Sequence, residues 1–198
     1  MFVSFVFVTA VFCVGGVWAQ GDTCCCYNTA IPHNGYWYQF VDCERTYAAA
    51  KTFCANSMTH PNGNTLTGGS VVWIEDSIEN EWLAYYINQT WGANKRYGIW
   101  IQYELFPTYP QYVPAGQCPN TFWWYWPTYG GSYSNWLSAP GGSSLAPDCQ
   151  YQVPEACSIL TNNKQFDDAP CDMRMKFICK LTVSTSGGGG GIPFDLGK

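Results

Sequence analysis

The chain has 198 residues, with 9 lysines and arginines, 14 aspartates and glutamates, and a net charge of −5 at neutral pH. This length predicts one domain with its own core, and 18% aromatic residues with only 12% charged residues argues against a disordered chain. The acidic balance argues against a nucleic-acid partner, because the chain would repel a phosphate backbone.

The first segment in chain order is almost entirely apolar. We interpret residues 1–19, which end at Ala19, as a secretory signal peptide, and this interpretation implies a secreted, extracellular protein. No lysine or arginine lies near Met1, so an uncleaved membrane anchor is the alternative. The stretch is slightly shorter than the roughly 20 residues that span a bilayer, and no second apolar run follows, so we expect no membrane span after cleavage.

The chain contains 11 cysteines, and removal of Cys13 with the signal peptide leaves ten. An even number in an oxidising compartment predicts disulfides, and the spacing lacks the paired Cys-x₂-Cys blocks of zinc modules. Residues 20–35 form a Cys-rich N-terminal segment, which contains Cys24, Cys25 and Cys26.

The remaining elements follow from hydrophobic spacing and turn residues. We expect Asp76 or Ser77 to cap the second of two helices. A strand, two helices and then several strands with a long loop predict an α+β fold, followed by a flexible Gly-rich tail at 182–198. In chain order we expect a strand at 36–41, a helix at 44–58, turns at 60–69, a strand at 71–74, a helix that begins at 76 and includes 87, and strands at 98–103, 122–126, 149–153, 157–160 and 176–181.

Five segments together resemble one known family. They are TYAAAKTFC at 46–54, IEDSIENEWLAYYI at 74–87, IWIQ at 99–102, the aromatic run at 124–136, and the ending with Phe166-Asp167-Asp168, Cys171 and Phe177-Ile178-Cys179. In order and spacing, residues 36–181 resemble a C-type lectin-like domain. Tyr47 stands where the family usually has Trp, and Gln102 replaces a glycine. The resemblance implies two helices, small antiparallel sheets and a long loop, stapled by disulfides.

The resemblance also implies two disulfides, Cys54 with Cys179 and Cys149 with Cys171. Six cysteines remain, and sequence alone allows 15 pairings among them. Adjacent cysteines are poor partners because their side chains diverge. We therefore hypothesise that each of Cys24, Cys25 and Cys26 bonds to one of Cys43, Cys118 and Cys157.

The family resemblance defines a possible calcium site in the long loop. Sugar-binding members supply ligands from a Glu-Pro-Asn or Gln-Pro-Asp triplet, a Glu just before a cysteine, and an Asn-Asp pair. Here we match the triplet to Ala139-Pro140-Gly141 and the Glu to Pro147, which leaves only Asp167 and Asp168 as remnants. Two carboxylates do not fill the six to eight oxygen ligands that calcium requires. We therefore expect no calcium site and no other cofactor, and we interpret Asp167-Asp168 as a solvated turn that caps the adjacent strand.

Aromatic side chains are the remaining candidates for ligand contact. Half of the block 123–126 should fill the core, and the rest should form an exposed face with Tyr109, Tyr112, Tyr129 and Tyr133. Asn88-Gln89-Thr90 is an acceptor motif for N-linked glycosylation, which places it on the surface. Our ligand-binding candidates are Trp126, Tyr129, Tyr133, Asp167 and Asp168.

Three classes of function remain to be compared. We favour a secreted binding module for a glycan or a protein, without the family's usual calcium-dependent sugar site. The alternative is an extracellular structural or matrix protein that uses the fold as a disulfide-stabilised scaffold with a Gly-rich tether. We expect no enzyme, because neither His33 nor His60 has a serine or cysteine nucleophile in a fitting context and disulfides consume the thiols.

Overall fold

The computed structural model describes residues 28–91, 98–105, 124–138, 146–147 and 155–182. The expected signal peptide, residues 20–27 of the Cys-rich segment and residues 183–198 of the expected tail lie outside the described residues, whereas Thr182 belongs to β11. The helices are α1 (Tyr47–Asn56) and α2 (Ser77–Trp91). The strands are β1 (Ile31–His33), β2 (Tyr36–Arg45), β3 (Met58–Thr59), β4 (Thr65–Leu66), β5 (Ser70–Val71), β6 (Ile99–Ile101), β7 (Glu104–Leu105), β8 (Trp124–Tyr125), β9 (Cys157–Leu160), β10 (Phe166–Ala169) and β11 (Met175–Thr182).

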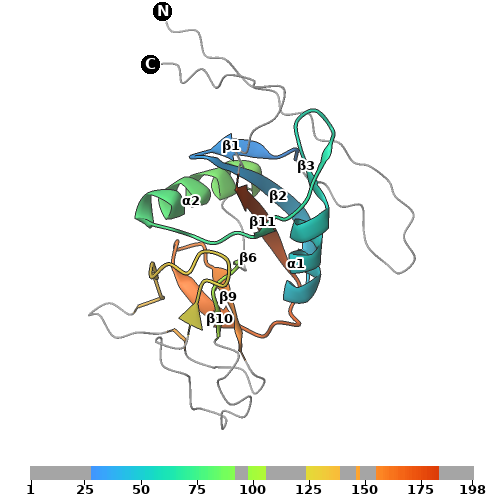
Figure 1. Cartoon of the computed structure of the whole chain (residues 1–198). Helices are drawn as coiled ribbons and strands as arrows, with labels where there is room; N and C mark the ends of the chain where they lie inside the picture. The colour runs from blue at the N-terminus through green and yellow to red at the C-terminus, as the bar shows by residue number, and fades with distance from the viewer. Residues whose placement is uncertain (1–27, 92–97, 106–123, 139–145, 148–154, 183–198) are drawn as a thin grey trace, which may run out of the picture.

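The main sheet is organised around its last strand in the sequence. Its order is β1-β2-β11-β6-β9-β10, and β5 also pairs with β11. β11 runs antiparallel to β2 and β5 and parallel to β6, whereas the β3–β4 and β7–β8 pairs form two small separate sheets. Figure 1 shows β11 crossing the centre of the domain, with β9 and β10 beyond it.

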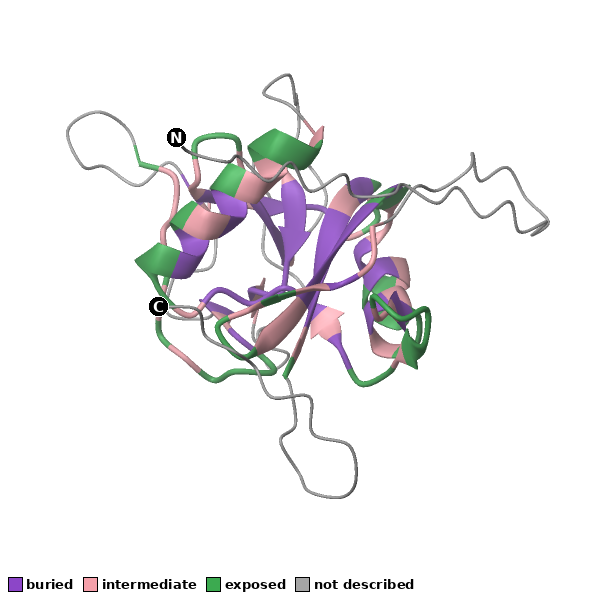
Figure 2. Ribbon diagram, turned by 90° about the horizontal axis from the view of Figure 1, so that it is seen from above, coloured by how far each residue is buried: buried purple, intermediate pink, exposed green. Residues whose placement is uncertain are grey.

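The central strands are buried on both faces because a helix covers each side. Successive residues of a strand point to opposite faces, so β11 sends Phe177 and Cys179 into one core and Ile178 into another. The first core packs against α1 through Ala50, and the second packs against α2 through Leu83. Figure 2 shows these buried strands between the two helices. The two-helix α+β architecture predicted from the sequence is confirmed.

Local side-chain contacts set where both helices begin. Thr46 caps α1 by accepting a hydrogen bond from the Ala49 amide at 3.4 Å. Asp76 caps α2, because its Oδ1 accepts from the Glu79 amide at 2.8 Å. Glu79 in turn reaches back, and its Oε2 accepts from the Glu75 amide at 2.8 Å, in the manner of a capping box. Of the two predicted caps for this helix, Asp76 is therefore the one used.

Two strands of the main sheet were not expected from the sequence. β1 pairs with β2, so the sheet begins at Ile31, before the predicted domain start at residue 36. β10 contains Asp167 and Asp168, which we expected in a solvated turn; instead Asp167 lies opposite Ile159, and Asp168 opposite Ser158. The two aspartates argued against a strand here, because aspartate is depleted from strands in general.

One predicted disulfide is present, and the other is wrong. Cys54 on α1 bonds to Cys179 on β11 across 125 residues, as the resemblance implies. Cys171 bonds to Cys157, at a separation of 14 residues, and not to Cys149. This pairing also removes Cys157 from the proposed partners of the N-terminal cysteines. Cys43 is disulfide-bonded too, whereas residues 24–26, 118 and 149 lie outside the described residues.

A buried lysine connects β11 to α2. Lys180 is fully buried, and its Nζ lies 2.6 Å from Glu79 Oε1 and 3.4 Å from Glu75 Oε1. It also donates to the Trp73 carbonyl at 3.2 Å. The rings of Tyr36 and Trp73 enclose the ammonium, with their centroids 4.1 and 4.4 Å from Nζ. Burial lowers the pKa of Lys180, and the two glutamates oppose that effect. Cation–π contacts and paired carboxylates thus replace the lost hydration of this charge.

Removing this charge should be far more damaging than removing an exposed one. We expect Lys180→Met to lower the free energy of unfolding by about 3–5 kcal/mol, because it leaves the buried Glu79 without its cation. Lys51→Met is the matched control: Lys51 pairs with Glu104 at 3.0 Å, but its side chain is 45% exposed, so its loss should cost less than about 1 kcal/mol. Urea unfolding followed by tryptophan fluorescence measures both. Equal losses in the two variants would contradict a central role for Lys180.

Candidate ligand-binding site

The aromatic candidates chosen from the sequence differ sharply in exposure. Trp126 is fully buried, stacks on Tyr103 with centroids 4.4 Å apart, and donates its indole N–H to the Tyr133 carbonyl at 2.8 Å. A side chain without exposed surface has no contact with solvent-borne ligands, so Trp126 is a core residue and is not available as the expected ligand contact. Tyr133 is half-buried and packs edge-on against Phe166. Tyr109 and Tyr112 lie outside the described residues.

Tyr129 is the candidate that the fold presents to solvent. It lies in the turn after β8 and is 45% exposed. Its ring lies over Gly131, since a Cβ built on Gly131 would be 1.8 Å from Tyr129 Cε1. The neighbouring Thr128 donates to the Ser70 hydroxyl at 3.4 Å, which holds the turn against β5. The Tyr129 ring can therefore occupy this surface position only because residue 131 has no side chain.

Two further residues, Tyr36 near Tyr129 and Glu75 bonded to Tyr36, were missed in the sequence. Tyr36 lies near enough for Tyr129 to contribute to raising the pKa of its phenol, although burial is the largest cause. The Tyr36 hydroxyl donates to Glu75 Oε1 at 2.6 Å, and the Trp73 indole donates to the same oxygen at 3.0 Å. We call Tyr36, Glu75 and Tyr129 the tyrosine patch. Tyr36 had been assigned only to a strand, and no local motif links it to a residue so distant in the chain.

The Glu75 carboxylate is held ionised at the edge of this patch. Burial alone would raise its pKa, but the hydrogen bonds from Tyr36 and Trp73, together with Lys180, lower the pKa below its usual value. Glu75 is half-buried, and Tyr129 offers an open ring face. Aromatic faces pack on the apolar faces of sugars and peptides, and a carboxylate accepts hydrogen bonds from hydroxyl or ammonium groups. This combination suits a polar organic ligand.

The observed disulfide changes how the calcium motif maps onto the chain. If Cys157 is the cysteine of that motif, the residue two positions before it is Glu155 and not Pro147. On that alignment the position carries a carboxylate, unlike the Pro147 that we matched to it from the sequence. A second proline-centred triplet, Ala146-Pro147-Asp148, then lies closer to the cysteine, and its first residue also has no side-chain oxygen. The Cys157–Cys171 spacing was the signal that could have found Glu155.

The described residues do not supply a calcium ligand set. Glu155 and Asp168 are buried, at 4% and 5% exposure, and Asp167 is half-buried. Within the described ranges, no three His, Cys, Asp or Glu side chains come close enough together to hold a metal ion. Asp148 lies outside those ranges. The described carboxylates alone thus do not supply the six to eight oxygens that calcium requires.

His33 belongs to an aromatic ladder at the outer side of β1. Its ring stacks on Trp82 with centroids 3.9 Å apart and an interplanar angle of 4°, and Tyr38 packs on it edge-on. Its Nε2 atom is buried and has no hydrogen-bond partner. Burial lowers the pKa of His33, Lys180 adds to this effect, and Glu79 opposes it. His33 therefore packs as a neutral ring between a strand and α2.

Comparison with known proteins shows the fold. Human lithostathine is 22% identical, with a TM-score of 0.52, over 77% of this chain and 96% of its own. The mouse scavenger receptor C-type lectin carbohydrate-recognition domain is 20% identical, with a TM-score of 0.53, over 77% of this chain and 95% of its own. The C-type lectin CEL-I from Cucumaria echinata is 18% identical, with a TM-score of 0.52, over 78% and 96%.

The similarity lies in structure and not in sequence. No protein-family model matches the chain, and no curated protein sequence matches it. The solved structures nevertheless confirm the C-type lectin-like fold that the motifs resemble. In the described part of the chain, no helix is both long and apolar enough to cross a membrane.

The lowered pKa of His33 predicts a loss of stability in mild acid. The unfolded chain takes up this proton near the usual value of 6.5, whereas the folded protein takes it up only at lower pH. The contribution of His33 is therefore complete above 6.5 and is lost as the pH falls toward its folded pKa. We expect the urea midpoint of the wild type to fall between about pH 7.5 and 5, and His33→Gln to reduce that fall.

His60→Gln is the control for this measurement. It removes the other histidine, which packs edge-on against Trp37 away from the Trp82 stack. A pH dependence that vanishes in this variant and persists in His33→Gln would contradict the assignment.

Proposed function

We propose that this chain, which has the C-type lectin-like fold, is a secreted extracellular binding module for a glycan or a protein and is not an enzyme. Two features support it: the apolar leader at residues 1–19, and solved structural neighbours that include a carbohydrate-recognition domain and a C-type lectin. The observation that carries the proposal is the exposed Tyr129 ring over Gly131, near Tyr36, whose hydroxyl donates to the ionised Glu75.

The tyrosine patch is the proposed contact surface. Tyr129 supplies a flat apolar face, and Tyr36 and Glu75 supply a hydroxyl and a carboxylate beside it. The patch is held in place from below by the buried Lys180 and Trp73, so little side-chain freedom is lost when a ligand binds. Tyr133, Asp167 and Asp168 remain candidates for secondary contacts, with less exposed surface than Tyr129.

We further propose that binding does not require calcium. Both proline-centred triplets, at 139–141 and 146–148, begin with alanine, so neither offers the first carboxylate or amide of the sugar-binding motif. Among the described residues, the carboxylates that could contribute are Glu155, Asp167 and Asp168, and they do not form a three-ligand group. Ligand contact through aromatic rings and hydrogen bonds needs no metal.

A structural role in an extracellular matrix is the second candidate. The observation that favours it is the dense covalent framework, in which two disulfides join α1 to β11 and β9 to the segment after β10. In this alternative, the Gly-rich residues near the C-terminus would serve as a tether. A matrix protein would bind no soluble glycan through the tyrosine patch.

A glycan array separates these proposals. We expect the secreted chain to bind a subset of glycans equally well with calcium and with a chelator. Tyr129→Ala should weaken the binding of the best glycan by about tenfold or more, because it removes the stacking face. Gly131→Ala should weaken it as well, because the new methyl group displaces the Tyr129 ring.

Tyr85→Ala is the matched control, since Tyr85 is a 60% exposed tyrosine on α2 outside the tyrosine patch. It should bind as the wild type does. Binding abolished by the chelator would refute calcium independence. If the protein binds no glycan on the array, a protein ligand or the matrix role is favoured.

A further inference from the structure

The glycosylation acceptor motif lies beside a cleft that the proposed function does not use. Asn88-Gln89-Thr90 is the single Asn-x-Ser/Thr motif in the whole chain, and it lies in the last turns of α2. Asn88 is exposed and borders a shallow cleft between α2, the start of β6 and the end of β9. The cleft is a surface depression: the space of about 330 Å³ over its lining residues includes open solvent.

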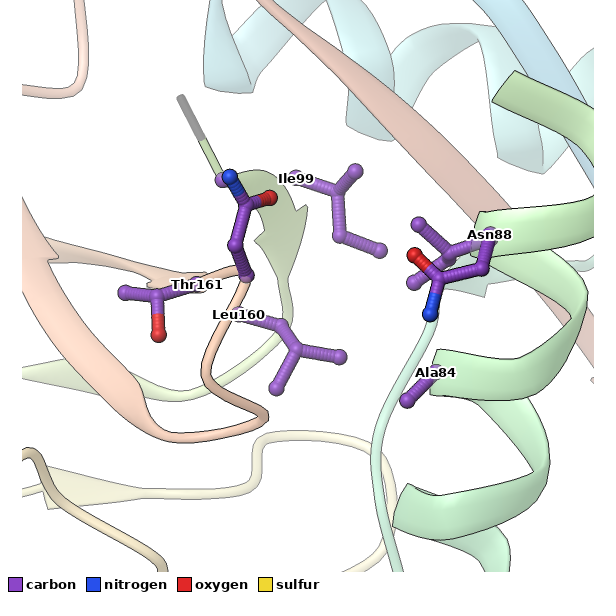
Figure 3. Close-up of a pocket in the computed structure, with 8 residues that line it drawn as sticks. Ala84, Asn88, Ile99, Leu160 and Thr161 are labelled. Carbon is purple, nitrogen blue, oxygen red and sulfur yellow. The ribbon is translucent and has the colours of Figure 1, made fainter. Parts of the chain in front are cut away.

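The cleft has an apolar floor and a polar rim. Ala84, Ile99 and Leu160 form the floor and are 7%, 2% and 3% exposed. The rim consists of Asn88, Thr161 and Asn162. Figure 3 shows the Asn88 side chain leaving α2 toward the space between Ile99, Leu160 and Ala84. Small-molecule sites combine these same features, an apolar lining with a few fixed polar groups.

An N-acetylhexosamine matches this arrangement. Its acetamido methyl and its apolar ring face suit the floor, and its amide and hydroxyl groups suit the side chains of the rim. A sugar attached to Asn88 is also present at a high effective concentration, so weak contacts suffice to hold it. A shallow cleft accommodates the first residue of a glycan and leaves the rest in solvent.

We propose that Asn88 carries an N-linked glycan and that its first N-acetylhexosamine lies in this cleft, where it joins α2 to the turn after β9. In the attachment step, Asn88 Nδ2 forms a bond to C1 of a lipid-diphosphate-linked oligosaccharide. The bond from C1 to the diphosphate oxygen breaks, the lipid diphosphate leaves, and the amide proton goes to solvent. The inference rests on the secretory route of the proposed function.

Two enzymes that trim the glycan differently test the contact. The full chain is expressed in a eukaryotic host that secretes high-mannose glycans, and its mass establishes occupancy. Endoglycosidase H leaves one N-acetylglucosamine on Asn88, whereas peptide-N-glycosidase removes the whole glycan and converts the residue to aspartate. We expect the intact and single-sugar forms to unfold at the same temperature. The sugar-free form should unfold about 2–4 °C lower.

Two variants separate the sugar from side effects of its removal. Thr90→Ala abolishes the acceptor without altering Asn88 and should match the sugar-free form, which excludes an effect of the new aspartate charge. Asn162→Ala removes a polar side chain from the rim of the cleft. It should reduce the difference in unfolding temperature between the single-sugar and sugar-free forms.

Three results would overturn the proposal. The first is protein in the medium without a sugar on Asn88, which would leave secretion itself intact. The second is a single-sugar form that is no more stable than the sugar-free form. The third is a difference in unfolding temperature between those two forms that is the same in Asn162→Ala as in the wild type. Because none of these results involves the tyrosine patch, they leave glycan or protein binding there to its own test.

Discussion

The ion pair between Lys180 and Glu79 is the interaction on which the arrangement of the domain depends. A fully buried ammonium is tolerated only where opposite charge and aromatic faces replace water, so its neighbours must all be in place at once. Those neighbours come from β2, from the segment before α2 and from α2 itself. The same cluster fixes Glu75, which accepts hydrogen bonds from Tyr36 and Trp73 at the surface. The interior charge and the candidate binding surface are thus two ends of one network.

The sequence was informative where the signal was local. Helix spacing located α1 and α2, a capping residue located the start of α2, and the family resemblance identified the Cys54–Cys179 pair. Cys149 and Cys157 both precede Cys171, and the shorter 14-residue separation of Cys157 was not used to choose between them. Because the calcium motif was aligned to Cys149 and not to Cys157, Glu155 was not considered as a possible ligand.

Contacts between distant segments were not predictable in the same way. Lys180 sits in an alternating strand near Lys176, and a lysine in that context normally points to solvent. Only the register of β11 against β2, with Lys180 opposite Tyr38, places it beneath α2. Trp126 shows the opposite error: an aromatic run suggested a surface, but the fold used that ring to fill the space against Tyr103. The composition of the tyrosine patch likewise became visible only once the sheet had brought its members together.

The position of β11 at the centre of the sheet has a consequence for biosynthesis. The strand that joins both cores, and that holds the thiol partner of α1, follows all of its strand partners in the sequence and is therefore synthesised after them. Until residues 175–182 emerge, β2 and β6 have no common neighbour, and Cys54 lacks its native disulfide partner, Cys179. The nascent chain must therefore keep an unusually aromatic interior exposed until β11 has been synthesised. Formation of the joined core and of the Cys54–Cys179 disulfide can therefore begin only after β11 has emerged.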